Sequence, residues 1–421
     1  MFFEKKRKNG PRLLIAPNKN TKATTVLILV GAGSRYETDD ERGIAHFLEH
    51  MFFKGGKIFD TPKKVAETID AIGADFNAFT GKEYAGYYVK CAGEHKETAF
   101  AVLSDMLLNT KLDPNDIKKE QKVIIEELNM YLDTPMYQIG WDFENLLFGD
   151  TPLGRDTIGI PETILSFSDA DFRHFRKELY TADNTIVVVS GDTTDAEKLT
   201  EKFFVFDDRQ KSKSFQPEKS DRPKKIHIRP KNTEQAHLVI GFPGVARGDA
   251  TEIATRLLAI ILGGNMSSRM FLKIREERGL CYSVSTSSDH FSDCGVFSTH
   301  AGVDISRVAE AISAICAEYA EISQNGISDD ELQKAKSFLK GKLTLKFEDS
   351  EEIASFLGTS AILGKEILSP DDLFQKIDAV KKADIDALAA KLFQKEKIKL
   401  AAIGPFSGRE NEFEKLITEK F

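Results

Sequence analysis

Residues 43–55 have the sequence GIAHFLEHMFFKG. The apolar residues in this stretch recur at the three- and four-residue spacing of an amphipathic helix. His46, Glu49 and His50 nevertheless stand inside that apolar pattern. Burying polar and charged groups of this kind is costly unless a partner satisfies them. The stretch therefore predicts a buried helix whose three polar side chains share a partner.

His46 and His50 lie one helical turn apart, so their side chains point the same way. Two imidazoles at this spacing can bind one Zn²⁺ through nitrogens about 2.0–2.1 Å from the ion. Glu49 falls within the same third of the helix surface, where it can reach a water on the ion more readily than the ion itself. The pattern predicts one zinc ion per chain, bound by His46 and His50, with Glu49 as general base. The alternative is a pair of hydrogen-bonded core histidines.

A third protein ligand must come from another element, and a helix expected over residues 113–132 offers carboxylates. Glu120 and Glu127 fall on the apolar stripe of that helix, whereas Glu126 falls on its polar face. A buried carboxylate needs a cation or hydrogen-bond donors. The stripe thus favours Glu120 or Glu127 over Glu126 as the third ligand, and periodicity does not rank the first two.

The order of the expected elements occurs twice along the chain. The polar stretch 207–225 contains two prolines and predicts a linker between domains at 1–206 and 226–421. The repeat predicts a duplicated α+β fold, in which each domain is a mostly antiparallel sheet covered by helices. The expected elements are 24–33, 75–91, 97–109, 113–132 and 185–192 in the first half, and 237–244, 250–264, 282–303, 306–323, 328–347 and 398–405 in the second.

Composition excludes several classes of partner. The net charge of −8 argues against nucleic acid or an anionic membrane as the main partner. No apolar run approaches the roughly 20 residues that span a bilayer. The N-terminal residues carry charges where a signal peptide is apolar. The four cysteines have no spacing typical of disulfide frameworks or zinc ribbons, so a cytoplasmic protein is expected.

The chain resembles the pitrilysin family of inverted-zincin metallopeptidases, whose signature is HxxEH. The resemblance extends over essentially the whole chain. In its size and two-domain form, the chain is similar to the short branch of the family that includes the mitochondrial processing peptidase β-subunit and its bacterial relatives. Besides the opening stretch, the blocks that carry it are IGADFNAFTGKEYAGYY (72–88), VIIEELNMYLDTP (123–135), PLGRDTIGIPETI (152–164) and RGLCYSVST (278–286).

The resemblance implies roles for individual residues. It makes His46, His50 and Glu127 the zinc ligands, Glu49 the base, and Glu120 a second essential carboxylate that orients a ligand histidine. It also implies a strand that binds the peptide substrate as an added β-strand, formed by Phe76, Asn77, Ala78 and Phe79.

Two residues of the second half also match the family. Arg275 and Tyr282 correspond to a pair that contacts the substrate main chain and the developing oxyanion. Without the family, a surface ion pair explains Arg275 and a half-buried strand aromatic explains Tyr282.

The resemblance implies a zinc endopeptidase that forms half of a clamshell chamber. Two chains, as a homodimer or as a heterodimer with a related chain, would enclose peptides or unfolded segments, with Arg275 and Tyr282 acting on the partner's zinc. The rival from another class is a non-catalytic scaffold, like the respiratory-complex core subunits that resemble this family. Such scaffolds typically lose parts of HxxEH, which this chain keeps.

Overall fold

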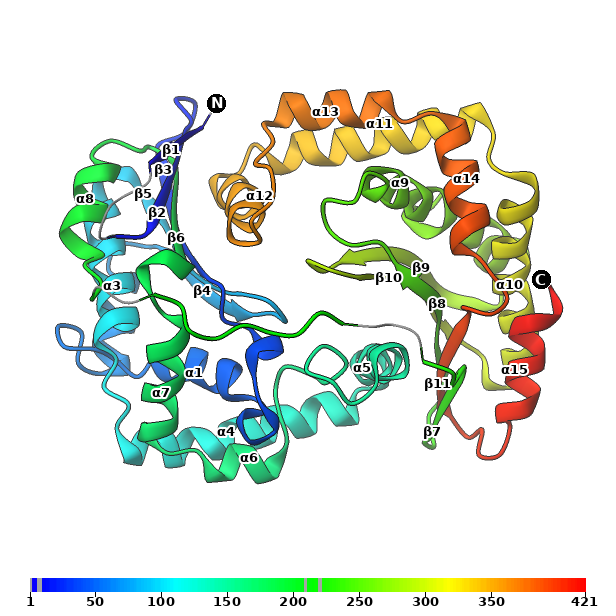
Figure 1. Ribbon diagram of the computed structural model, residues 1–421, viewed down its shortest axis with the longest axis horizontal. Helices are drawn as coiled ribbons and strands as arrows, with labels where there is room; N and C mark the ends of the chain where they lie inside the picture. Colours follow the sequence, from blue (N-terminus) through cyan, green and yellow to red (C-terminus); the bar gives the residue numbers. More distant parts are fainter. Residues whose placement is uncertain (1, 6–9, 208–209, 219–221) are drawn as a thin grey trace. The chain divides into compact units, whose positions relative to one another are not determined.

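The computed structural model describes residues 2–5, 10–207, 210–218 and 222–421. These residues form two compact units, each built on one β-sheet (Figure 1). The first unit contains Met1–Leu128, Asp156–Gln216 and Thr344–Pro370, and the second contains Asn129–Arg155, Pro217–Leu343 and Asp371–Phe421.

The sheet of the first unit has the strand order β1-β2-β6-β3-β5-β4. Among its described strands only β2 and β6 pair in parallel, and the other neighbours are antiparallel. β4 therefore forms one edge. The strands are β1 (Phe3–Lys5), β2 (Arg12–Pro17), β3 (Ala23–Val30), β4 (Asp75–Thr80), β5 (Ala85–Ala92) and β6 (Thr185–Gly191).

Helices cover both faces of this sheet, which explains why β3 is apolar almost throughout. Successive side chains of a strand point to opposite faces. Leu27 and Leu29 pack on α12, and Val26 and Ile28 are buried on the other face. The helices of the first unit are α1 (Ile44–Phe52), α2 (Pro62–Asp70), α3 (Lys96–Asn109), most of α4 (Pro114–Asp133), α6 (Pro161–Ser166), α7 (Asp169–Leu179), α8 (Ala196–Phe203) and α12 (Ser350–Ile362).

The second unit repeats this plan with a sheet of order β7-β11-β8-β10-β9, in which β9 is an edge strand. Its strands are β7 (Ile226–Pro230), β8 (Ala236–Gly244), β9 (Cys281–His290), β10 (Gly295–Val303) and β11 (Lys399–Gly404). Its helices are α5 (Pro135–Phe148), α9 (Glu252–Gly263), α10 (Val308–Asn325), most of α11 (Asp329–Lys346), α13 (Pro370–Ala379), α14 (Lys382–Leu392) and α15 (Glu410–Glu419), with a π-helical turn at Phe271–Glu276.

The fold confirms the expected class: two mostly antiparallel sheets, each covered by helices. The division of the chain differs from a simple cut at the linker, because α5 packs on β8 and β11 of the second unit and α12 packs on β3 and β6 of the first. Each half thus contributes one helix to the other half's sheet. The boundary Gln216/Pro217 lies within the predicted linker 207–225, of which residues 208–209 and 219–221 are outside the described part. In the described chain, no helix has the length and apolar character to cross a membrane.

Candidate metal centre

α1 carries the motif, and its start is fixed by two residues that precede it. Gly43 adopts φ 90°, and a Cβ there would meet the Ile158 carbonyl oxygen at 2.4 Å, so glycine is required. The buried Glu37 carboxyl group accepts hydrogen bonds of 2.9 Å from the backbone N–H groups of Gly43 and Ala45. These donors lie at the helix N-terminus, where backbone N–H groups lack intrahelical partners. Glu37 therefore anchors the helix that presents the motif.

His46, His50 and Glu127 come together at one point, on α1 and α4. The three candidate ligand atoms lie within 4.8 Å of one another. Nε2 of His46 is 3.7 Å from Oε1 of Glu127, and Nε2 of His50 is 3.4 Å from Oε2. Two ligands at about 2.05 Å from one tetrahedral ion are separated by about 3.3 Å. The donor set and its spacing therefore fit a zinc ion.

Glu120 lies beside this cluster, not within it. Oε1 of Glu120 is 2.9 Å from Nδ1 of His50, and its other oxygen forms an ion pair with Lys54. This contact leaves Nε2 of His50 directed at Glu127. The structure thus separates the two carboxylates that periodicity left equal: Glu127 faces both imidazoles, and Glu120 holds one of them from behind, the arrangement that orients metal-bound histidines.

Burial and neighbouring charges shift the pKa values of the groups in this cluster. Burial raises the pKa of Glu120, but hydrogen bonds from His50 and Lys54 outweigh it, so the pKa lies below its usual value and the carboxylate stays charged. Burial lowers the pKa of His50, and its hydrogen bonds to Glu120 and Glu127 raise it to about 9. Burial and the neighbouring His50 lower the pKa of His46 to about 4. A cation at this point would replace the proton of His50, because a metal ligand must be deprotonated.

Glu49 lies on α1 beside the two histidines. Its carboxylate accepts a 2.5 Å hydrogen bond from the hydroxyl of Thr80, the last residue of β4. Burial raises the pKa of Glu49, and the Thr80 hydrogen bond acts in the opposite direction. A carboxylate with a raised pKa is better suited to accept and return a proton than one at its usual value.

The predicted docking strand, Phe76 to Phe79, is the edge strand β4. Phe76 packs against Phe53 at the end of α1, with ring centroids 5.7 Å apart. Gly81 donates its N–H to the Tyr84 carbonyl, and antiparallel pairing alternates from there, so the main-chain groups of Phe76, Ala78 and Thr80 face the open edge. The Asn77 side chain accepts the Ala78 N–H. The other outward groups, which are those of Phe76 and Thr80 and the Ala78 carbonyl, are the ones that β4 can offer to an added strand.

Arg275 and Tyr282 belong to the second unit, whereas the metal cluster is built within the first. The Arg275 guanidinium lies over the rings of Phe271 and Tyr282, 4.6 and 5.5 Å from their centroids, and 3.7 Å from the Glu276 carboxylate. Tyr282 is 78% exposed on the edge strand β9, so it is not the half-buried strand aromatic that β-propensity alone suggests. An exposed phenol beside a guanidinium can donate a hydrogen bond to an incoming molecule.

Sequence reasoning missed three residues around the site: Glu37, Lys54 and Thr80. Lys54 lies four residues after His50 and could have been found by helical spacing. Thr80 shares the face of Phe76 and Ala78 in an alternating strand. Glu37 had no such signal, because its partners are main-chain N–H groups.

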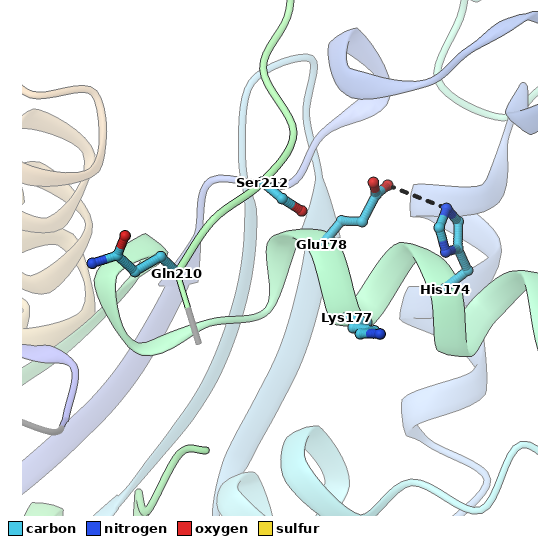
Figure 2. Close-up of a pocket in the computed structure, with 5 residues that line it drawn as sticks. All are labelled: His174, Lys177, Glu178, Gln210 and Ser212. Carbon is cyan, nitrogen blue, oxygen red and sulfur yellow. Dashed lines mark ion pairs between the residues drawn. The ribbon is translucent and has the colours of Figure 1, made fainter. Parts of the chain in front are cut away.

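A separate hollow of about 350 Å³ lies on the first unit, between α7 and the segment that follows α8 (Figure 2). An ion pair of 3.6 Å joins His174 and Glu178 at its rim, and the His174 side chain is 65% exposed. Exposed pairs of this kind contribute little free energy. The residues that line the hollow include none of the predicted site: His174, Lys177, Glu178, Gln210 and Ser212.

A chain of two similar domains with an HxxEH helix belongs among the metallopeptidases, as its matches to known families show. The chain belongs to peptidase family M16: residues 12–158 match the model described as insulinase (peptidase family M16), and residues 166–339 match the peptidase M16 inactive domain. This confirms the resemblance to the pitrilysin family.

Relatives of similar length carry the name of zinc protease. The chain is 34% identical over 398 residues to the uncharacterised zinc protease YmxG of Bacillus subtilis, covering 94% of this chain and 97% of that one. It is 33% identical over 411 residues to an uncharacterised zinc protease of Rickettsia bellii, covering 96% and 98%. These relatives support a zinc-dependent protease.

Two solved structures show the same fold. A protease from Helicobacter pylori superposes with a TM-score of 0.91 at 22% identity, covering 96% of this chain and 99% of that one. A chain of Complex III2 from Candida albicans superposes with a TM-score of 0.82 at 18% identity, covering 99% of both. At these identities the likeness concerns the fold alone.

Proposed function

We propose that this chain is a zinc endopeptidase that hydrolyses peptides or unfolded segments. The observation that carries the proposal is the convergence of His46, His50 and Glu127 beside the carboxylate of Glu49. His46, His50 and Glu127 would hold one zinc ion, and Glu120 would orient His50. When bound, zinc lowers the pKa of a water molecule to about 7 and polarises a carbonyl group.

The chain's own residues account for the remaining steps. The open edge of β4 holds the peptide main chain by strand addition, which binds many sequences with little side-chain selection. Glu49 accepts a proton from the water that attacks the peptide carbonyl, and then returns that proton to the leaving amine. The C–N bond breaks, and one carboxylate and one amine are released. Tyr282 and Arg275 would donate hydrogen bonds to the oxyanion and to the peptide main chain.

Mass spectrometry of a mixed peptide library tests this function. We expect internal cleavage that stops on chelation and returns when zinc is restored. Folded proteins should be cleaved far more slowly than unfolded peptides. A chain that is loaded with zinc yet cleaves no peptide would contradict the proposal.

We also propose that two chains enclose the substrate, with Tyr282 and Arg275 of one serving the zinc of the other. Mixing Glu49→Gln chains with Tyr282→Phe chains should recover activity above either variant alone, because one of the two sites in a mixed dimer is intact. Mixed dimers without recovery would contradict action across the interface. Gel filtration of the active chain distinguishes a homodimer from the catalytic subunit of a heterodimer.

A cytoplasmic location stays a prediction.

The scaffold alternative draws on the likeness to a chain of Complex III2 from Candida albicans. That likeness concerns the fold alone. A purely structural role would not require His46, His50 and Glu127 to converge at ligand spacing. The amount of zinc bound per chain separates the two functions. A chain that binds no zinc and cleaves no peptide would favour the scaffold.

A further inference from the structure

Thr80 occupies a position that joins two parts of the site. Its side chain donates the 2.5 Å hydrogen bond to Oε2 of Glu49. Its main chain is the last residue of the edge strand β4, with its polar groups on the open side. One residue therefore contacts the proposed base and also ends the proposed docking edge.

The surroundings hold Thr80 in place from both sides. The turn that follows it is fixed by the backbone N–H of Arg35, which donates to the Lys82 carbonyl at 2.8 Å. The same Arg35 forms a 2.7 Å ion pair with Glu83, and both side chains are almost fully buried. At the other end of β4, Phe76 packs on Phe53 of the α1 C-terminus. β4 is thus fixed against the helix that carries Glu49.

We propose that Thr80 is a positioning residue that aims the Glu49 carboxylate. Its hydroxyl engages one carboxylate oxygen and leaves the other, Oε1, for proton transfer. Because the same residue ends the docking edge, the register of a bound peptide is fixed relative to the base. This inference rests on the proposed endopeptidase function and adds to it a residue outside HxxEH.

The test compares Thr80→Val, which keeps the branched shape but removes the hydroxyl, with Thr80→Ser, which keeps the hydroxyl. A hydrogen bond to a charged group supports an expected fall in kcat of about 10- to 100-fold for Thr80→Val. KM should stay within about twofold, since the main chain of β4 is unchanged. Thr80→Ser should recover kcat to within about threefold of the wild type. Thr24→Val is the matched control, because it removes the 2.7 Å hydrogen bond that the hydroxyl of a buried threonine in the same sheet donates to the Asp192 carbonyl, and it should leave kcat unchanged.

Two further readouts separate positioning from a structural effect. The zinc dissociation constant, measured by competition with a chromophoric chelator, should be the same in Thr80→Val and in the wild type. In a Glu49→Gln background, Thr80→Val should cause no further loss of rate, because the hydroxyl acts through Glu49.

Wild-type kcat in Thr80→Val, weakened zinc binding, or a full additional loss in the Glu49→Gln background would each overturn the inference. A zinc-loaded wild type that cleaves no peptide would refute the proposed function as well. An active wild type with an equally active Thr80→Val would refute the inference alone.

Discussion

Helices α4 and α11 have the same place in the order of elements of the two units, and one position that is buried in both carries a carboxylate in α4 and an apolar residue in α11. Each begins after a residue whose carbonyl accepts the first helical hydrogen bond, Asp113 in α4 and Ser328 in α11. Seven residues later stand Glu120 and Ala335, both buried. Glu120 contacts His50 and Lys54, whereas Ala335 belongs to the apolar core of its unit. The scaffold therefore accepts either residue, and only the carboxylate requires a set of charged partners.

The helices that follow the first long strand of each unit, α1 and α9, differ in the same way. The buried residues of α9 are apolar apart from Thr255 and Gly263. α1 keeps an apolar face of similar kind but adds two histidines and Glu49 on its other side. Burial of apolar faces maintains both units, and the polar groups of the first unit are additions to that plan.

The largest effect is expected from Glu49→Gln, which removes the base and keeps the shape of the side chain. Loss of general base catalysis lowers rates by about 10²- to 10⁴-fold. Zinc content should stay at one ion per chain, because Glu49 is not among the three converging ligands. Peptide cleavage and elemental analysis of the same sample measure both. Retention of activity would show that another group moves the proton.

Glu120→Ala places the residue of the second unit in the first. His50 would lose its partner and Lys54 its counter-charge, so zinc affinity should fall about 10- to 100-fold. Glu126→Ala is the matched control, because Glu126 is an exposed carboxylate on the same helix. Chelator competition measures both constants. Equal affinities in the two variants would contradict the orienting role of Glu120.

A smaller effect, on how stability depends on pH, is expected from the acidic residues that precede α1 and α9. Before α1, burial raises the pKa of Glu37 to about 8, despite hydrogen bonds from Ala45 and Gly43. Before α9, hydrogen bonds from Thr251 lower the pKa of the exposed Asp249. Between the unfolded value of about 4.5 and the folded value of about 8, the folded chain keeps a proton on Glu37 that the unfolded chain releases. Stability from this group therefore falls as pH rises through that window.

Glu37→Gln should remove this dependence, so the Tm of the wild type should fall by a few degrees relative to the variant between pH 5 and about 8. The Tm of Asp249→Asn should change with pH in parallel with the Tm of the wild type in that range. The contribution of Asp249 is present above its usual pKa and is lost only in acid. Parallel curves for Glu37→Gln and the wild type would contradict a raised pKa at Glu37.

Strong periodic signals predicted much of the fold from the sequence. The predicted hairpins at 75–91 and 282–303 correspond to β4–β5 and β9–β10, and the four long helices after them lie within a few residues of the predicted bounds. The sequence did not predict that α5 packs on the sheet of the second unit and α12 on the sheet of the first. An amphipathic pattern shows that a helix has an apolar face, but it does not show which sheet that face packs on. The parallel strand β2, RLLIAP, was also missed, since its partner β6 is distant in sequence.

At the site, helical spacing brought out His46, Glu49 and His50, and the apolar stripe of α4 brought out Glu120 and Glu127. Spacing could not separate the two glutamates, because both lie on the same face and only the position of α1 distinguishes them. Alternation along β4 places Thr80 on the face of Phe76 and Ala78, but its contact with Glu49 depends on how β4 lies against α1, which spacing does not give.

The most direct test of the proposed metal centre is anomalous diffraction at the zinc edge from crystals of the zinc-loaded chain. A zinc ion held by these three ligands should give one anomalous peak, about 2.0–2.2 Å from Nε2 of His46, Nε2 of His50 and a carboxylate oxygen of Glu127. A crystal of fully loaded protein with no peak there, or with the ion bound by other residues, would contradict it.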